Sequence, residues 1–143
     1  MKNLNPSKVP LSLYVHLPWC EKKCPYCDFN INTNKLEGDE DKLLEALHQD
    51  LRGSGQYIQN RKFSSVYFGG GTPSLVSAKM IKKILINLID MGLLKEGCEI
   101  SFELNPKEVT HPYIEEIIEA GVNRISIGIQ SFDQNTLDAL ERN

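Results

Sequence analysis

A predicted strand that runs directly into a cysteine loop decides how this chain is interpreted: residues 11–27 are LSLYVHLPWCEKKCPYC. Apolar and polar side chains alternate over residues 11–17, and Pro18 ends the pattern, which predicts a β-strand. Three cysteines follow within the next ten residues. In parallel α/β folds, functional sites form where strands end. The loop after this first strand is therefore the first candidate site.

The spacing of those cysteines, Cys20, Cys24 and Cys27, leaves a metal site one ligand short. A structural zinc takes four ligands, and a [4Fe–4S] cluster normally has a thiolate on each of its four irons. Three thiolates leave one iron open for another ligand, which is the mark of a catalytic metal centre. A zinc knuckle, a disulfide with a spare thiol, and chance remain as alternatives at this point.

Strands and helices alternate outward from this loop. Alternating or continuous apolar runs predict the strands, and apolar residues at helical spacing with Ser, Thr or Asp caps predict the helices. The predicted strands are 11–17, 64–68, 99–104 and 124–129, and the predicted helices are 39–51, 78–91, 111–120 and a last one from Asp133. Four consecutive strand–helix units predict an α/β fold with a parallel sheet, as part of a (β/α) barrel.

The predicted units do not close a barrel. The fourth strand would be an open sheet edge, and a (β/α) barrel needs further units. We therefore expect residues 1–143 to be the N-terminal portion of a larger domain, with the rest of the barrel absent. A complete four-stranded α/β domain is the alternative.

Composition narrows the function classes. The net charge is −3, and no block of Lys or Arg suggests a nucleic-acid partner. No apolar run approaches the ~18 residues of a transmembrane segment, and the polar N-terminus lacks the apolar stretch of a signal peptide. Clustered cysteines are typical of metal or redox sites in a reducing compartment, so we expect a cytoplasmic protein.

The other three predicted strands also end in residues suited to a site. Gly69–Thr72 follows the second strand, Glu103 lies at the end of the third, and Gln130 follows the fourth. Because the carboxyl ends of parallel strands meet at one edge, we expect these segments to converge with the cysteine loop.

The glycine-rich segment Gly69–Thr72 would allow a ligand to approach closely, and its amides can form an anion-binding nest. It lacks the Lys of a phosphate-binding P-loop and the spacing of a dinucleotide-binding turn, which argues against a nucleoside triphosphate. A ligand with a carboxylate and an ammonium group suits it. A strand-to-helix turn that needs glycine for its backbone dihedrals is the alternative.

Individual polar side chains carry two interpretations each. Glu103 can accept a hydrogen bond from an ammonium or ribose hydroxyl, or it can fix its own loop. Gln130 can contact a ligand or cap a strand end. Tyr14 and His16 share one strand face, where Tyr14 can contact a ligand and His16 fits a hydrogen-bonded core residue better than a metal ligand. We interpret Cys98 as a small apolar residue, with a fourth ligand as the alternative.

The motifs together resemble the radical S-adenosylmethionine superfamily. Within it they are most similar to the oxygen-independent coproporphyrinogen III oxidase group, and above all to its HemW-type haem chaperones. The matching strings are Tyr14–Cys20 (YVHLPWC), Cys24–Asn30 (CPYCDFN), Phe68–Ser74 (FGGGTPS), Glu103–Pro106 (ELNP) and Ser126–Phe132 (SIGIQSF).

This resemblance implies a fold, two cofactors and their ligands. The fold would be a partial radical S-adenosylmethionine barrel. Cys20, Cys24 and Cys27 would hold three irons of a [4Fe–4S] cluster, and the open iron would chelate the amino and carboxylate groups of S-adenosylmethionine. Electron transfer from the cluster would then cleave the cofactor and yield a 5′-deoxyadenosyl radical. The residues implied to contact S-adenosylmethionine are Tyr14, Tyr26, Gly70, Gly71, Thr72, Glu103, Gln130 and Arg142.

One residue of this sequence bears on the branch within the group. Porphyrinogen dehydrogenases carry a further cysteine where this chain has Phe29, so the resemblance favours the haem-chaperone branch. It implies transfer of haem to apo-haemoproteins, with a flavodoxin- or ferredoxin-like reductant. The haem-binding motif would lie in the absent C-terminal part. Oxidative decarboxylation of coproporphyrinogen III is the alternative, so whether the protein is an enzyme stays open, and a zinc-bound or metal-free module is the third interpretation.

Overall fold

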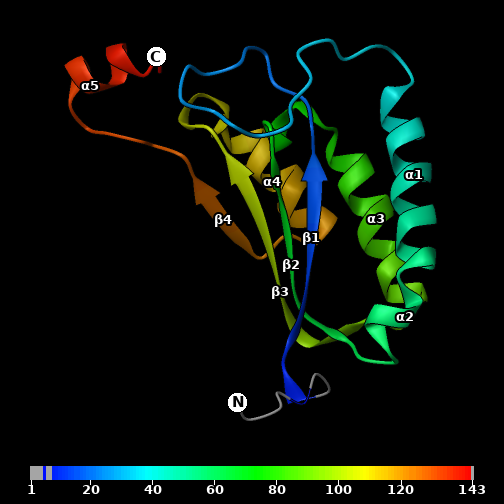
Figure 1. Cartoon of the computed structure of the whole chain (residues 1–143). Helices are drawn as coiled ribbons and strands as arrows, with labels where there is room; N and C mark the ends of the chain where they lie inside the picture. Colours follow the sequence, from blue (N-terminus) through cyan, green and yellow to red (C-terminus); the bar gives the residue numbers. More distant parts are fainter. Residues whose placement is uncertain (1–4, 6–7, 143) are drawn as a thin grey trace.

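The computed structural model describes residue 5 and residues 8–142, and its centre is a sheet of four parallel strands (Figure 1). The strands are β1 (Leu11–Leu17), β2 (Phe63–Gly70), β3 (Leu94–Leu104) and β4 (Arg124–Ile127), in the spatial order β1-β2-β3-β4. Consecutive strands are neighbours and parallel throughout. The predicted α/β fold with four strand–helix units is confirmed.

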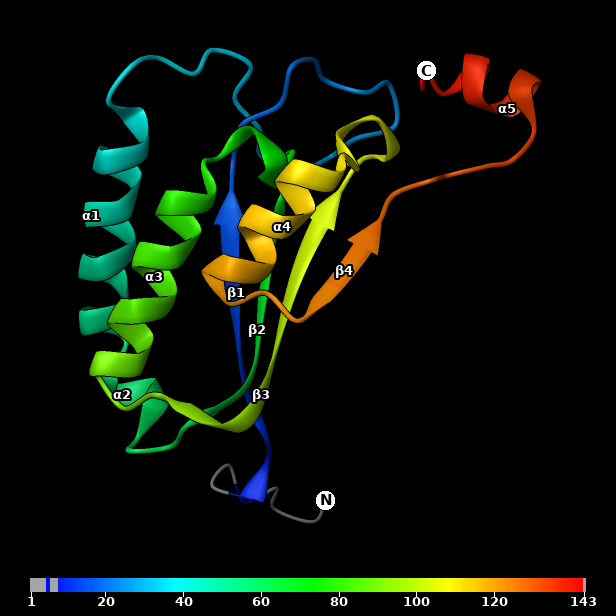
Figure 2. The same cartoon turned by 180° about the vertical axis from the view of Figure 1, so that it is seen from behind.

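The helices separate into a layer against the sheet and a segment beyond it. Figure 2 shows α1, α3 and α4 on one face of the sheet, while α5 lies beyond the end of β4. The α-helices are α1 (Asp39–Gly53), α2 (Gly55–Ile58), α3 (Ala78–Asp90), α4 (His111–Ala120) and α5 (Gln134–Ala139), and two 3₁₀ turns, Pro73–Leu75 and Pro106–Glu108, follow β2 and β3. Among the residues described, no helix combines the length and apolar character that crossing a membrane requires.

The core lies between the sheet and the helix layer. Alternation in β1 turns Val15 and Leu17 toward the helices and leaves Ser12 and Tyr14 exposed on the other face. Each fully buried side chain of this size contributes ~1.5–3 kcal/mol relative to exposure. The largest fully buried apolar side chains are Phe68, Phe102, Leu17, Ile81, Leu85, Leu88, Ile117, Val66 and Val76.

The opposite face of the sheet is polar, and none of the described helices lies over it (Figures 1 and 2). Its side chains bond to one another across strands: Ser65 Oγ donates to Ser12 Oγ at 2.7 Å, and Arg124 Nη1 donates to Ser101 Oγ at 3.1 Å. Such hydrogen bonds satisfy polar groups that a one-layer sheet leaves facing solvent. Only the helix face is therefore a hydrophobic core.

Three strands differ in length from the predicted ones. β2 is Phe63–Gly70 rather than residues 64–68, so it extends into the glycine-rich segment. β3 begins at Leu94 rather than at residue 99, because Leu94 pairs with Phe63 and Gly97, at φ +67°, absorbs a break in register. This places Cys98 inside the strand and buried, consistent with its interpretation as a small apolar residue. β4 ends at Ile127 rather than at residue 129, because Ile129 N donates to Ile127 O at 3.0 Å and bends the chain off the sheet.

Candidate functional site

A cavity of about 900 Å³ lies at the carboxyl ends of the strands and gathers nearly all the predicted site residues. The ends of β2, β3 and β4 and the loop that follows β1 contribute to its wall, as the parallel topology requires. The predicted residues that line it are Cys20, Cys24, Cys27, Tyr26, Gly70, Gly71, Thr72, Glu103, Gln130 and Arg142. Tyr14, on β1, does not line the cavity. The predicted convergence on one rim is confirmed.

The cysteine loop, residues 18–32, is closed at its base by backbone hydrogen bonds. Cys20 N donates to Asn32 O at 3.0 Å, and Asn32 N donates to Pro18 O at 2.8 Å. Within the loop, Cys27 N donates to Cys24 O at 3.1 Å, which makes a tight turn between two of the thiols. None of the three cysteines is in a disulfide, and all are half-buried. The loop thus presents three free thiols on one short segment.

The thiols of this loop influence one another. Burial raises the pKa of Cys20, and the neighbouring thiols of Cys27 and Cys24 raise it further, while a hydrogen bond from Thr72 Oγ1 opposes both. Thr72 Oγ1 lies 3.6 Å from Cys20 Sγ. Within residue 5 and residues 8–142, no three His, Cys, Asp or Glu side chains already form a metal-binding group. The role of these cysteines as iron ligands stays a prediction.

The glycine loop, Gly69–Thr72, is packed so closely that side chains do not fit at Gly70 or Gly71. A Cβ on Gly71 would stand 2.5 Å from Trp19 O, and Gly70, at φ +118°, would place one 2.7 Å from the His16 ring. The amides of Gly71 and Thr72 donate to Leu17 O and Trp19 O at 2.8 and 2.7 Å. The predicted anion nest is therefore wrong for these two amides, because they are already paired with the backbone at the end of β1.

Glu103 is held in place by a tyrosine that the sequence interpretation missed. Tyr67 Oη donates to Glu103 Oε1 at 2.6 Å, and the ring of Tyr67 stacks on Tyr14 with centroids 6.2 Å apart. This hydrogen bond, together with burial, raises the pKa of Tyr67. The register between β2 and β3 could have identified this contact. The parallel pairing of Phe68 with Phe102 puts Tyr67 and Glu103 on the same face of the sheet. Tyr14 reaches the site through this stack.

Arg142 joins the C-terminal segment to the rim. Its Nε donates to Tyr26 Oη at 2.8 Å, and its Nη1 donates to Asn105 Oδ1 at 2.7 Å. Figure 1 shows the corresponding approach of the segment after α5 to the cysteine loop. Arg142 is therefore half-buried, donates two hydrogen bonds and forms part of the cavity wall, unlike an ordinary exposed arginine. Asn105 was not anticipated as its partner, although it lies in the quoted ELNP string.

Gln130 and His16 occupy different environments. Gln130 is exposed and adopts φ +68° in the segment that leaves β4, a conformation that is uncommon outside glycine. Both ring nitrogens of His16 are bonded: Nδ1 lies 3.2 Å from Tyr14 Oη, and Nε2 lies 2.9 Å from Asn30 O. Because a carbonyl only accepts, Nε2 carries the proton. His16 is hydrogen-bonded, as predicted, but it is half-buried on the polar face of the sheet and not in the core.

Sequence comparison finds relatives of this chain among known proteins. The Radical SAM superfamily model matches residues 14–143. The chain is 43% identical over 141 residues to the heme chaperone HemW of Haemophilus influenzae, covering 96% of this chain and 37% of that protein. It is 32% identical over 133 residues to the oxygen-independent coproporphyrinogen III oxidase of Salmonella typhimurium, covering 93% of this chain and 29% of that protein.

The fold also has a solved counterpart. The structure of coproporphyrinogen III oxidase from Escherichia coli, described as a Radical SAM enzyme, superimposes with a TM-score of 0.77 at 31% identity. The match covers 97% of this chain and 32% of that chain. The chain thus spans about a third of the length of the relatives it matches.

Proposed function

The chain belongs to the radical SAM superfamily, and from this premise we propose that it is the N-terminal part of a haem chaperone that binds a [4Fe–4S] cluster and S-adenosylmethionine. One observation carries the cofactor proposal: a single cavity joins three free thiols, on the loop after β1, to the ends of β2, β3 and β4. The chaperone assignment is supported by 43% identity to HemW proteins against 32% to the oxidase of Salmonella typhimurium.

The residues present fit an iron–sulfur cluster. Cys20, Cys24 and Cys27 are free, lie on one short loop and face the same cavity, and thiolates are the usual ligands of such clusters. In this proposal they hold three irons and leave the fourth to S-adenosylmethionine. When bound, the cluster supplies the electron needed to cleave that cofactor.

The remaining walls suit a cofactor with ammonium, carboxylate and ribose groups. Glu103 keeps a second carboxylate oxygen beside Gly69, which can accept a hydrogen bond. Gln130 offers both donor and acceptor atoms, and Tyr26 presents a ring at the cavity wall. Gly70, Gly71 and Thr72 form the floor, and Tyr14 supports Glu103 through Tyr67. In this proposal Arg142 contacts the ligand and closes the wall.

Haem delivery distinguishes the preferred function from its alternative. Haem, a flavodoxin- or ferredoxin-like reductant and apo-haemoprotein clients enter the proposal as partners of the longer protein. Oxygen-independent oxidation of coproporphyrinogen III is the second candidate, supported by the 31% identity to the solved oxidase. Phe29, largely exposed two residues beyond Cys27, favours the chaperone, because the resemblance expects a further cysteine there in the oxidases.

An anaerobic reconstitution tests the cofactor proposal. Iron and acid-labile sulfide would be assayed, and the EPR spectrum of the dithionite-reduced protein recorded with and without S-adenosylmethionine. We expect a [4Fe–4S] signal that changes when the cofactor is added. Zinc without sulfide would support the non-catalytic module instead, and a cluster that ignores the cofactor would contradict the open iron.

A second assay separates the two candidate functions. The longer protein would be incubated anaerobically with a reductant and S-adenosylmethionine, once with coproporphyrinogen III and once with haem and an apo-haemoprotein. Haem transfer without formation of vinyl groups is the expected outcome. Appearance of the decarboxylated porphyrin would establish the oxidase.

A further inference from the structure

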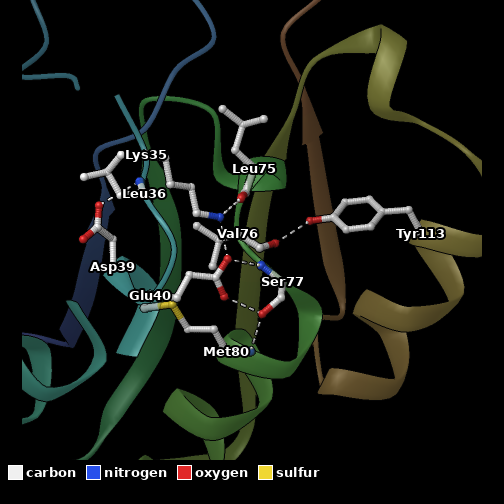
Figure 3. A network of polar contacts seen from close by, with 9 residues as sticks. All are labelled: Lys35, Leu36, Asp39, Glu40, Leu75, Val76, Ser77, Met80 and Tyr113. Carbon is white, nitrogen blue, oxygen red and sulfur yellow. Dashed lines mark hydrogen bonds and ion pairs between the residues drawn. The ribbon is translucent and has the colours of Figure 1, made fainter. Parts of the chain in front are cut away.

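A cluster of polar side chains on the outer side of the rim connects the exits of the cysteine and glycine loops (Figure 3). At its centre is Glu40, in the first turn of α1. Its Oε1 accepts from Ser77 N at 3.1 Å, and its Oε2 accepts from Ser77 Oγ at 2.5 Å. Ser77 Oγ also accepts from Met80 N, so it is the N-cap of α3. The carboxylate of α1 thus binds the residue that starts α3.

Lys35 completes this cluster from the cysteine-loop side. Its Nζ donates to Glu40 Oε1 at 2.5 Å and to the backbone oxygen of Leu75. The same ammonium lies over the ring of Trp19, 5.2 Å from the centroid, in a cation–π contact. Figure 3 shows Lys35 between Glu40 and Leu75. We name Lys35, Glu40, Ser77 and the Leu75 carbonyl the rim clamp.

The position of the rim clamp relates it to both loops. Trp19 immediately precedes Cys20, and Leu75 and Ser77 follow closely after Thr72. The clamp side chains line a separate hollow on the outer surface and not the 900 Å³ cavity. They therefore cannot contact a ligand in that cavity. Any effect of the clamp on ligand binding must pass through the two loops.

The charges within the rim clamp are matched. Lys35 and Glu40 are both about three-quarters buried as side chains, so their ion pair is better shielded than the surface pairs of this protein. Burial raises the pKa of Glu40, but the hydrogen bonds from Lys35 and Ser77 outweigh it and leave the pKa below its usual value. A shielded, charge-assisted contact of this kind holds its partners at a fixed distance better than an exposed pair does.

We propose that Lys35 and Glu40 are positioning residues, which set the separation of the cysteine loop from the glycine loop and thereby the fit of S-adenosylmethionine between them. This inference rests on the proposed function. A cofactor that is bound to the cluster on one side and lies against Thr72 and Glu103 on the other spans both loops. Because a small error in spacing weakens every contact on the far side, the clamp controls cofactor affinity without touching the cofactor.

The test uses Lys35→Met and Glu40→Gln, with Lys83→Met as the matched control. Lys83 Nζ pairs with Asp41 Oδ1 at 3.3 Å and links the same two helices, α1 and α3, without contacting either loop. Each variant would be reconstituted anaerobically and titrated with S-adenosylmethionine by EPR. We expect Lys35→Met and Glu40→Gln to keep their iron and sulfide but to bind the cofactor about tenfold more weakly. Lys83→Met should bind as the unsubstituted chain does.

A conservative variant separates positioning from general destabilisation. Lys35→Arg retains the cation and its hydrogen-bond donors, and it should recover most of the lost affinity. Equal weakening in Lys35→Met and Lys83→Met would overturn the inference. So would a loss of affinity that follows the drop in thermal midpoint across all four variants, because a merely structural tie predicts that correlation.

Amide hydrogen exchange supplies a readout that needs no cofactor. In the unloaded chain, Lys35→Met should speed exchange at the amides of Cys20, Gly71 and Thr72, while Lys83→Met should not. Unchanged exchange at these amides would refute the clamp even if the cofactors bind. Faster exchange, in a chain that binds neither cluster nor cofactor, would refute the proposed function and leave the coupling of the loops established.

Discussion

The cysteine loop and the glycine loop meet at one rim but are fixed in opposite ways. The glycine loop is buried at Gly69 and Gly70 and half-buried beyond them, and its shape is set by contacts so close that a methyl group at Gly71 would meet Trp19 O. The cysteine loop is mostly exposed, and its backbone hydrogen bonds to the rest of the chain lie at its base, where Cys20 pairs with Asn32. One loop is complete without a ligand, whereas the other leaves its functional groups free to bind one.

The largest effect is expected from substitutions in the cysteine loop, whose thiols are free to bind a ligand. Cys20→Ala, Cys24→Ala and Cys27→Ala should each abolish the reconstituted cluster, because each variant leaves only two thiolates to hold four irons. The fold should survive, since these side chains lie outside the hydrophobic core. Iron, sulfide and far-ultraviolet circular dichroism would check both statements.

Cys98→Ala is the control for that series. Cys98 lies within β3 and does not line the cavity, so the variant should keep a full cluster. Loss of iron in Cys98→Ala would make Cys98 a ligand, and retention of a full cluster in any of the first three variants would remove that cysteine from the ligand set.

The second largest effect is expected in the glycine loop, whose shape depends on close packing. Gly71→Ala should lower the free energy of unfolding by about 1–3 kcal/mol or more, because the new Cβ would displace backbone atoms rather than a flexible side chain. Gly53→Ala is the matched control, since nothing lies within 4 Å of a Cβ there and its φ is not in the left-handed region. Urea denaturation would compare them. Equal stability of the two variants would remove the contrast between the loops.

A smaller effect, on the affinity for S-adenosylmethionine, is expected from Glu103 in the cavity wall and from its partner Tyr67. Glu103→Ala should weaken S-adenosylmethionine binding and leave iron content unchanged, because Glu103 faces the cavity from β3 and is not a cluster ligand. Tyr67→Phe should weaken it less, by about fivefold, since it removes one hydrogen bond and keeps the ring stacked on Tyr14. Titration by EPR measures both. An unchanged affinity in Glu103→Ala would show that Glu103 only fixes its own loop.

The smallest expected effect is the loss of stability of the rim clamp in acid. The pKa of Glu40 is lowered in the folded chain, so its contribution is fully present above the ordinary carboxyl value of 4.5. It is lost as the pH falls through the lowered folded value. The stability difference between the unsubstituted chain and Glu40→Gln should therefore shrink only below pH 4.5, as thermal melts across that range would show. A difference that does not change with pH would exclude an ionised Glu40 from the rim clamp.

The features that could be predicted from the sequence are periodic or local. Strand alternation, helix spacing and the positions of strand ends together predicted that the cysteines, Thr72 and Glu103 share one rim. The Ser77 cap could be predicted because capping needs only the three residues that follow. Strand ends were less predictable, since β4 stops where a local backbone bond, from Ile129 to Ile127, replaces its pairing with β3.

The missed features are contacts between distant side chains. Lys35 reaches the Leu75 carbonyl across forty residues, and Arg142 reaches Asn105 across thirty-seven. Neither pair belongs to a repeat or to one element, so no sequence spacing indicates it. Tyr67 differs, because it lies on a predicted strand two residues before Gly69, and working out the register with the third strand would have placed it beside Glu103.

The burial of Trp19 has a practical consequence. It is the only tryptophan in the chain, its side chain is 4% exposed, and it precedes the first cysteine of the loop. A cluster held by the proposed thiols would lie close enough to this indole to take up its excitation through near-ultraviolet and visible absorption. Trp19 would then act as an intrinsic fluorophore, and the quenching of its emission would time the arrival of the metal in solution without any added label.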